Sequence, residues 1–76
     1  MPTAEEVRRR IEARLAEARV DVVDTTGAGD HFEVRVVAPA FGTLGLVEQH
    51  RLVYDALGDL MTTIHALSLR TATPGG

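Results

Sequence analysis

The sequence predicts a small α+β domain in which helices cover one face of a three-stranded mixed sheet. Three observations favour this class: segments with apolar residues at helical spacing, short segments rich in β-branched residues, and the order α-β-β-α-α-β along the chain. The chain has 76 residues, which is enough for one small domain. We therefore expect a single domain over residues 1–76, with a frayed tail over about 71–76.

The first helix is predicted from Ala4 to Ala18. Thr3 followed by Glu6 fits a capping box, in which a hydroxyl and a carboxylate bind free backbone N–H groups at the start of a helix. Apolar residues then recur at helical spacing and form one stripe: Val7, Ile11, Leu15 and Ala18.

Four arginines cluster in this helix, in "RRRIEAR", but glutamates are interleaved with them. At i,i+4 spacing, Glu5 can pair with Arg9 and Glu6 with Arg10. Because the whole chain carries a net charge of −3, the pattern favours a solvated helix face over a nucleic-acid-binding patch.

Two strands joined by a glycine-containing turn are predicted next. Val20 to Asp24 is short and rich in β-branched residues, and "TTGAGD" supplies turn formers, with Gly27 and Gly29 able to take positive φ. In "HFEVRVVA", which begins at His31, apolar and polar residues alternate as in a half-buried strand. The pair predicts an antiparallel β-hairpin.

The segment "PAFGTLG" breaks the second strand, and a second amphipathic helix follows it. We expect Gly58 to end or bend this helix, a short helical turn to follow, and the last strand to run from Ile64 to Arg70. One predicted stripe of the helix contains Leu46, Val53, Leu57 and Leu60, with Val47, Tyr54 and Met61 beside it.

The topology makes a prediction about two histidines. The long crossover through the second helix most simply makes the second and third strands parallel, with a right-handed connection. His31 begins one of these strands and His65 begins the other, so both should lie at the same end of the sheet. Two neighbouring neutral imidazoles are plausible metal ligands.

Packing is the alternative role for these residues. Side-chain alternation places His65 on the same face as Leu67 and Leu69, which suits a partly buried packing residue. His31 follows a turn and is expected to be exposed, so packing explains it less well. His50 lies on the apolar stripe of the second helix, and we interpret it as a hydrogen-bonded residue at the edge of the core rather than a ligand.

Composition excludes several classes of function. Cysteine is absent, so the chain alone cannot build a thiolate metal site or supply a cysteine nucleophile, although a partner could bring thiolates. No paired carboxylates in an apolar setting, nucleophile motif or phosphate-binding glycine loop is present, which argues against an enzyme. No apolar run of about 18 residues and no hydrophobic signal region are found, so we expect a soluble cytoplasmic protein with no membrane contact.

One weak motif indicates nucleic acid. "GTLG", from Gly42 to Gly45, matches the GxxG pattern of KH domains. In KH domains that loop joins two helices and carries basic residues, whereas here it is predicted to follow a strand and contains Thr43 and Leu44. The match is therefore poor.

The residues that carry most of the motifs resemble the BolA family over nearly the whole chain. The most specific pieces are "VVAPAF", "QHRLVYDAL" and "IHALSLRTATP", which occur in the family's order and spacing, and "DTTGAGDHF" fits as well. This resemblance implies a class II KH-like α+β fold.

The resemblance also implies a function. BolA-like proteins are non-enzymatic partners of monothiol glutaredoxins with a CGFS motif, and the heterodimer shares a [2Fe–2S] cluster held by the glutaredoxin cysteine, glutathione and ligands from the BolA-like chain. The histidine of "IHA" matches His65, and His31 is the one candidate here for the second ligand, which the family takes from the loop between the first two strands. This implies a role in iron–sulfur assembly, trafficking or iron regulation.

DNA binding is the second function implied by the resemblance. The family's helix-turn-helix-like region has been linked to transcriptional control of morphology or stress genes. Here that region offers Arg51, together with Gly42 and Gly45, but also carries Glu48 and Asp55. We therefore rank a DNA-binding regulator second, and the sequence leaves open whether the free domain forms a homodimer.

Overall fold

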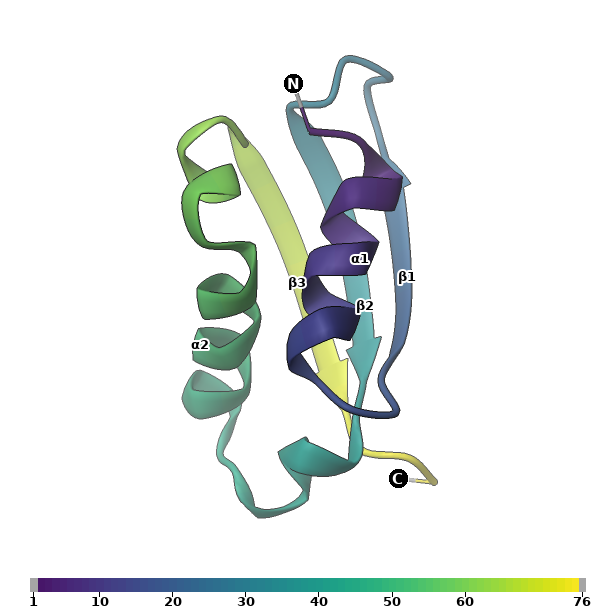
Figure 1. Ribbon diagram of the computed structural model, residues 1–76, viewed down its shortest axis with the longest axis vertical. Helices are drawn as coiled ribbons and strands as arrows, with labels where there is room; N and C mark the ends of the chain where they lie inside the picture. The colour runs from purple at the N-terminus through teal and green to yellow at the C-terminus, as the bar shows by residue number, and fades with distance from the viewer. Residues whose placement is uncertain (1, 76) are drawn as a thin grey trace.

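The computed structural model describes residues 2–75. Within these residues the elements follow the predicted order, and both α-helices cover the same face of the sheet (Figure 1). Along the chain they are α1 (Ala4–Arg14), β1 (Arg19–Asp24), β2 (His31–Val37), the 3-10 helix η1 (Pro39–Thr43), α2 (Leu46–Leu57), the 3-10 helix η2 (Gly58–Thr62) and β3 (Ala66–Ala72). The arrangement confirms the predicted α+β class.

The strands of the described chain form a three-stranded sheet in the order β1-β2-β3. β1 pairs with β2 in antiparallel orientation, with Val22 opposite Val34. β2 pairs with β3 in parallel orientation, with Val34 opposite Leu69. Both predicted pairings are confirmed, and β2 lies at the centre of the sheet.

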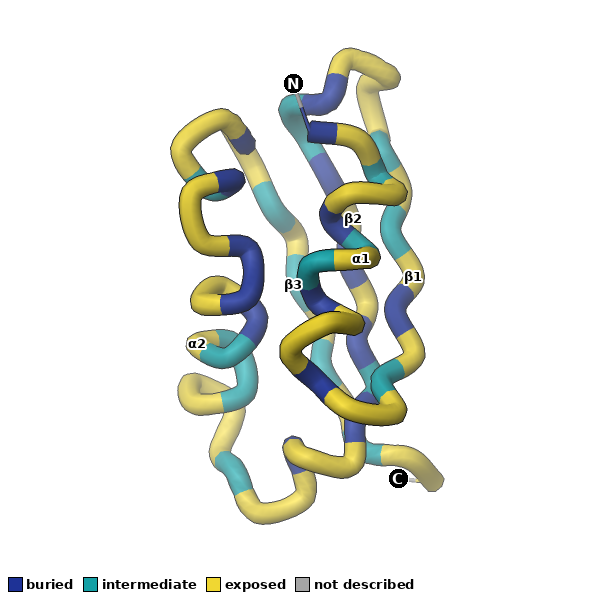
Figure 2. Tube along the Cα trace, in the orientation of Figure 1, coloured by how far each residue is buried: buried dark blue, intermediate teal, exposed yellow. Residues whose placement is uncertain are grey.

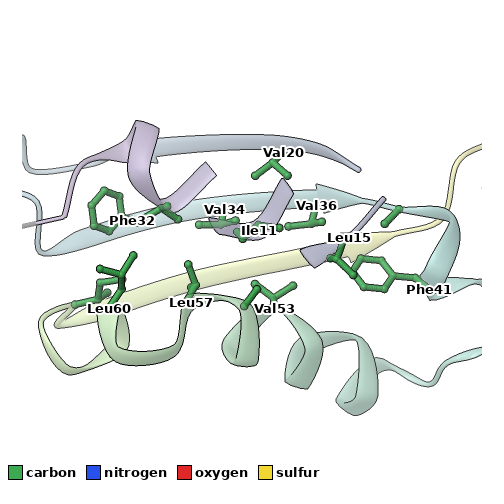
Figure 3. Packing of buried hydrophobic residues seen from close by; sticks show 14 residues of the cluster. Ile11, Leu15, Val20, Phe32, Val34, Val36, Phe41, Val53, Leu57 and Leu60 are labelled. Carbon is green, nitrogen blue, oxygen red and sulfur yellow. The ribbon is translucent and has the colours of Figure 1, made fainter. Parts of the chain in front are cut away.

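The core lies between this sheet and the two α-helices. Alternation along β2 sends Phe32, Val34 and Val36 into it, while Glu33 and Arg35 are exposed on the face that the α-helices leave open. Figure 2 shows buried residues along β2 and on the facing sides of the helices, and Figure 3 shows the buried side chains gathered between them. The remaining core residues are Val7, Ile11, Leu15, Val20, Ala38, Phe41, Val53, Ala56, Leu57, Leu60 and Ile64.

Helix α1 begins where the sequence predicts and ends earlier. The Thr3 hydroxyl accepts a hydrogen bond from the Glu6 backbone N–H at 3.1 Å, which confirms this half of the predicted cap. The prediction that the helix reaches Ala18 is wrong, because Leu15 takes an extended conformation and Glu17 has φ of 58°. Leu15 is still buried, so the apolar periodicity continues for one residue beyond the helix.

The arginines of α1 are paired on its surface. Arg8 bonds to Glu5 and to Glu12, and the predicted pair of Arg9 with Glu5 is present at 3.5 Å. Arg10 does not pair with Glu6. Its guanidinium instead reaches the end of α2, where it donates to the Leu57 carbonyl at 3.3 Å and to Asp59 at 3.1 Å.

Helix α2 ends at Gly58, which takes φ of 53°, and η2 follows as the predicted short helical turn. Val53 and Leu57 are fully buried, as expected. The assignment of Leu46 to the buried stripe is wrong, because this side chain is 62% exposed. Leu46 lies in the first turn of α2, which is the end of the helix nearest to η1 along the chain (Figure 1).

Strand β3 starts and ends two residues later than predicted. Ala72 pairs with Val37 and its carbonyl accepts from the Ala38 N–H at 3.1 Å, while the Thr71 hydroxyl donates to Gln49 at 2.6 Å. The expectation of a frayed tail is therefore wrong for residues 71 and 72, and residue 76 lies outside the described part of the chain. Between residues 2 and 75, no helix has the length and apolar character needed to cross a membrane.

Candidate functional site

The structure brings His31 and His65 together at one end of the sheet. His31 is the first residue of β2, His65 directly precedes β3, and the parallel register places His31 opposite Ala66. The two imidazole ring centres are 6.0 Å apart and their planes are inclined by 56°. The predicted proximity of these residues, which are distant in sequence, follows directly from the parallel pairing.

His65 is exposed, which contradicts its predicted role as a partly buried packing residue beside Leu67 and Leu69. The alternation argument assumed that His65 belongs to the strand, but β3 begins at Ala66. What fixes His65 is its backbone, because its N–H donates to the Asp30 carbonyl at 2.8 Å. The backbone of His65 is thus fixed by a hydrogen bond, while its imidazole is accessible to solvent.

His31 is only half-exposed, with 42% of its side-chain surface accessible. Its Nδ1 atom is buried and lies 3.0 Å from Oδ1 of Asp30. The distance suits a hydrogen bond from an Nδ1–H donor, although the alignment falls short of a well-formed one. Nδ1 therefore faces the protein.

The loop between β1 and β2 is ordered by two aspartates. Asp24 accepts hydrogen bonds from the backbone N–H groups of Gly27 and Gly29, each at 2.9 Å. Both glycines have φ of 78°, which confirms the expectation of positive φ and is a conformation that L side chains rarely adopt. Asp30 accepts from the Thr26 hydroxyl at 2.7 Å. The loop that leads into His31 is consequently well hydrogen-bonded.

The carboxyl group of Asp30 is strongly perturbed. The hydrogen bond from Thr26, followed by the contact with His31, lowers the pKa of Asp30 from 3.8 to about 2. Both interactions favour the ionised carboxylate. At neutral pH, His31 therefore has a negatively charged neighbour at its Nδ1 side.

The histidine pair can supply ligands to a metal centre but cannot complete one. Between residues 2 and 75, no group of three or more His, Cys, Asp or Glu side chains is placed to hold a metal ion. Two imidazoles on one exposed edge, in a chain without cysteine, instead fit a centre whose other ligands come from elsewhere. Imidazole binds several transition metals, and it can also replace part of the usual thiolate ligation of an iron–sulfur cluster.

His50 does not join this pair. It lies on α2, half-buried, with its ring in edge contact with Tyr54 at a ring-centre distance of 6.4 Å. The prediction that His50 is hydrogen-bonded is wrong for Nε2, which is buried and has no hydrogen-bond partner among the described residues. A side chain on the helix edge can pack well while its polar atom stays unpaired.

The residues considered for nucleic-acid binding lie in η1 and the first half of α2, and η1 lies at the opposite end of the molecule from the starts of β2 and β3 (Figure 1). Gly42 is part of η1, Gly45 is the N-cap of α2, and Arg51 is exposed on α2. The "GTLG" segment thus begins inside a short 3-10 helix and ends at the N-cap of α2, rather than directly following a strand, which corrects the expected context. The structure does not bring these three residues to the histidine pair.

Sequence reasoning missed Asp30 and Thr26. The signal was present in "TTGAGDH", where a carboxylate immediately precedes His31 and a threonine lies four residues before the carboxylate. Hydroxyl and carboxylate side chains in turns commonly bind local polar groups. The contact between the Asp30 carbonyl and β3, however, depends on the tertiary fold.

The fold defines a class II KH-like α+β domain with an exposed histidine pair at one end of its sheet. The family model for BolA-like proteins matches residues 6–76, and the chain belongs to this family.

Individual relatives agree with this assignment. The chain is 40% identical to Protein BOLA2 of Arabidopsis thaliana, over 95% of its own length and 78% of the relative's. It is 35% identical to the DNA-binding transcriptional regulator BolA of Escherichia coli, covering 88% of this chain and 75% of that one. A solved bolA homologue from Coxiella burnetii superposes with a TM-score of 0.80 at 43% identity, covering 97% of this chain and 94% of the other.

Proposed function

We propose that this protein is a non-enzymatic partner of a monothiol glutaredoxin with a CGFS motif, with which it shares a glutathione-ligated [2Fe–2S] cluster. The observation that carries the proposal is the His31–His65 pair, which offers two imidazoles on one exposed edge and has no third ligand beside it among the described residues. Such a pair needs a second protein to complete a metal centre. The family assignment supports the same function.

The two histidines have different parts in this function. His65 is exposed and held at its backbone, so its imidazole can reach a cluster presented by another protein. His31 is more constrained and serves as the second ligand from this chain. A bound cluster would supply redox-active iron, whose potential shifts when imidazole replaces thiolate.

This assignment gives the protein a role in iron–sulfur assembly, trafficking or iron regulation, which we place in the cytoplasm. The chain presents the two imidazole ligands at one end of its sheet, and the glutaredoxin and glutathione provide the thiolates. A heterodimer is the expected assembly.

Mixing the protein with a CGFS glutaredoxin, glutathione and reconstituted iron and sulfide tests the proposal. The visible absorption and circular dichroism of the cluster should change relative to the glutaredoxin and glutathione alone, because imidazole ligands alter the charge-transfer bands. Size-exclusion chromatography should show a heterodimer that contains iron. A cluster spectrum that is identical with and without this protein would reject the proposal.

A DNA-binding transcriptional regulator, of the kind associated with stress responses, is the second candidate. It is supported by the name of the Escherichia coli relative and by the exposed surface at Gly42, Gly45 and Arg51. A gel shift that weakens as salt increases would support this function, because phosphate contacts release counterions. No shift at low salt would remove it.

A further inference from the structure

We infer that Asp30 is the positioning residue of the histidine pair, acting on His31 through its carboxylate and on His65 through its backbone carbonyl. This inference rests on the proposed function, because it concerns how the two ligands are presented. Asp30 contacts both histidines directly. It therefore connects the first residue of β2, His31, with the residue that precedes β3, His65.

The carboxylate of Asp30 selects which nitrogen of His31 is available. Nδ1 of His31 is buried, and its polar neighbour is Oδ1 of Asp30 at 3.0 Å. A carboxylate accepts hydrogen bonds, so the neutral ring is stabilised with its proton on Nδ1. Nε2 then keeps its lone pair for a metal, as in metal sites where a carboxylate orients the ligating histidine.

The carboxylate is itself held in place. The Thr26 hydroxyl donates to the same Oδ1 atom at 2.7 Å, and its oxygen accepts from the Ala28 backbone N–H at 3.2 Å. Asp30 is also partly covered, with 25% of its side-chain surface accessible. The orientation of His31 is thus fixed through the folded loop and does not depend on a free surface side chain.

The backbone of Asp30 acts on the other histidine. Its carbonyl oxygen accepts from the N–H groups of His65 at 2.8 Å and of Ala66 at 3.1 Å. These hydrogen bonds join the end of the β1–β2 loop to His65 and to Ala66, the first residue of β3. A side-chain substitution at Asp30 leaves this carbonyl in place, so the two actions can be separated by experiment.

Long-range ¹H–¹⁵N spectra of the imidazole rings in the metal-free protein test the inference. At about pH 8.5, above the ordinary pKa of imidazole, these spectra report which nitrogen carries the proton. We expect the Nδ1–H form of His31 to predominate in the natural chain. In Asp30→Ala the His31 equilibrium should shift toward the Nε2–H form that the side chain of free histidine favours, while the His65 tautomer should stay unchanged.

Matched variants separate positioning from a general loss of structure. Asp55→Ala removes an exposed aspartate on α2 and should leave both histidine tautomers unchanged. Thr26→Val keeps Asp30 but removes the hydroxyl that holds it, and should shift His31 in the same direction by a smaller amount. If Asp30→Ala fails to fold, as judged by its backbone amide spectrum, Thr26→Val carries the test.

Two results would overturn the inference: a natural chain in which His31 is mainly Nε2–H, or variants at Asp30 and Thr26 that leave the His31 tautomer unaltered. Because the measurement needs no glutaredoxin or cluster, its failure is distinct from failure of the proposed function. In the loaded complex, Asp30→Ala should release its cluster to a chelator about tenfold faster. An unchanged release rate, with a shifted tautomer, would also contradict a positioning role.

Discussion

Strand β2 connects two regions of the molecule that are built in opposite ways. Its interior contributes Phe32, Val34 and Val36 to the core, where each is at most 3% exposed and contacts apolar side chains. Its first residue, His31, lies at the end of the sheet, where the contacts are polar and the side chains are partly accessible to solvent. One strand thus provides stability along its length and a ligand at its start, and the two properties should respond to different substitutions.

The largest expected effect is on the core side. Phe32→Ala should lower the free energy of unfolding by about 3–5 kcal/mol, because it removes a buried aromatic side chain and leaves a cavity. A small domain has about 5–15 kcal/mol in total, so this variant should be marginally folded. Urea unfolding followed by circular dichroism measures the loss. A loss below about 1 kcal/mol would show that the core does not depend on Phe32 as described.

Helix α2 offers the same comparison with one residue type. Leu57 is fully buried and Leu46 is 62% exposed. Leu57→Ala should lower the free energy of unfolding by about 2–5 kcal/mol, whereas Leu46→Ala should change it by less than about 0.5 kcal/mol. Thermal and urea denaturation of both variants provide the measurement. Equal losses in the two variants would contradict the exposure of Leu46.

A fall in pH should weaken the contacts of the Asp30 carboxylate, beside the histidine pair, before it affects the apolar core. The hydrogen bond from Thr26, followed by the contact with His31, lowers the pKa of Asp30 to about 2. A carboxyl whose folded pKa is depressed stabilises the protein above its unfolded pKa of about 3.9, and this contribution disappears as pH falls toward the folded value. Relative to Asp30→Asn, the natural chain should therefore lose stability between about pH 4 and about pH 2.

Urea midpoints of both proteins across this pH range test that expectation. In Thr26→Val the main cause of the lowered pKa is absent, so the loss should occur over a narrower range of pH. A difference between the natural chain and Asp30→Asn that is independent of pH would argue against the contacts around Asp30.

The smallest expected change in stability is at the histidines. His65→Ala removes an exposed ring whose backbone bond to Asp30 remains, so the free energy of unfolding should change by less than about 0.5 kcal/mol. Urea denaturation of this variant measures it. A loss comparable to that of Leu57→Ala would show that His65 has a packing role after all.

The core region was largely predictable from the sequence, because apolar periodicity and glycine positions are local signals. They located the hairpin and the end of α2 at Gly58, and the long crossover between the second and third strands then indicated their parallel pairing. They did not locate the end of α1, because Leu15 continues the apolar pattern while its backbone is already extended. Exposure of Leu46 was missed for a related reason, since periodicity indicates a helix face but not how far the neighbouring elements cover it.

The histidine edge was only partly predictable. Strand order placed His31 and His65 at one end of the sheet, but alternation gave the wrong exposure for His65, because β3 begins at Ala66 and does not include it. The role of the Asp30 carbonyl depends on a contact between residues that are distant in sequence. Backbone contacts of this kind leave no residue-type signature, so no sequence pattern indicates them.

We propose that His31 and His65, and not His50, meet the cluster of a monothiol glutaredoxin. The most direct measurement is the visible circular dichroism of the cluster in the mixture with a CGFS glutaredoxin and glutathione, recorded for the natural chain, His65→Ala and His50→Ala. His50 is the matched control, because it lies on α2 away from the pair. We expect His65→Ala to return the spectrum to that of the glutaredoxin alone and His50→Ala to leave it unchanged. A spectrum insensitive to His65→Ala would show that His65 is not a ligand of the cluster.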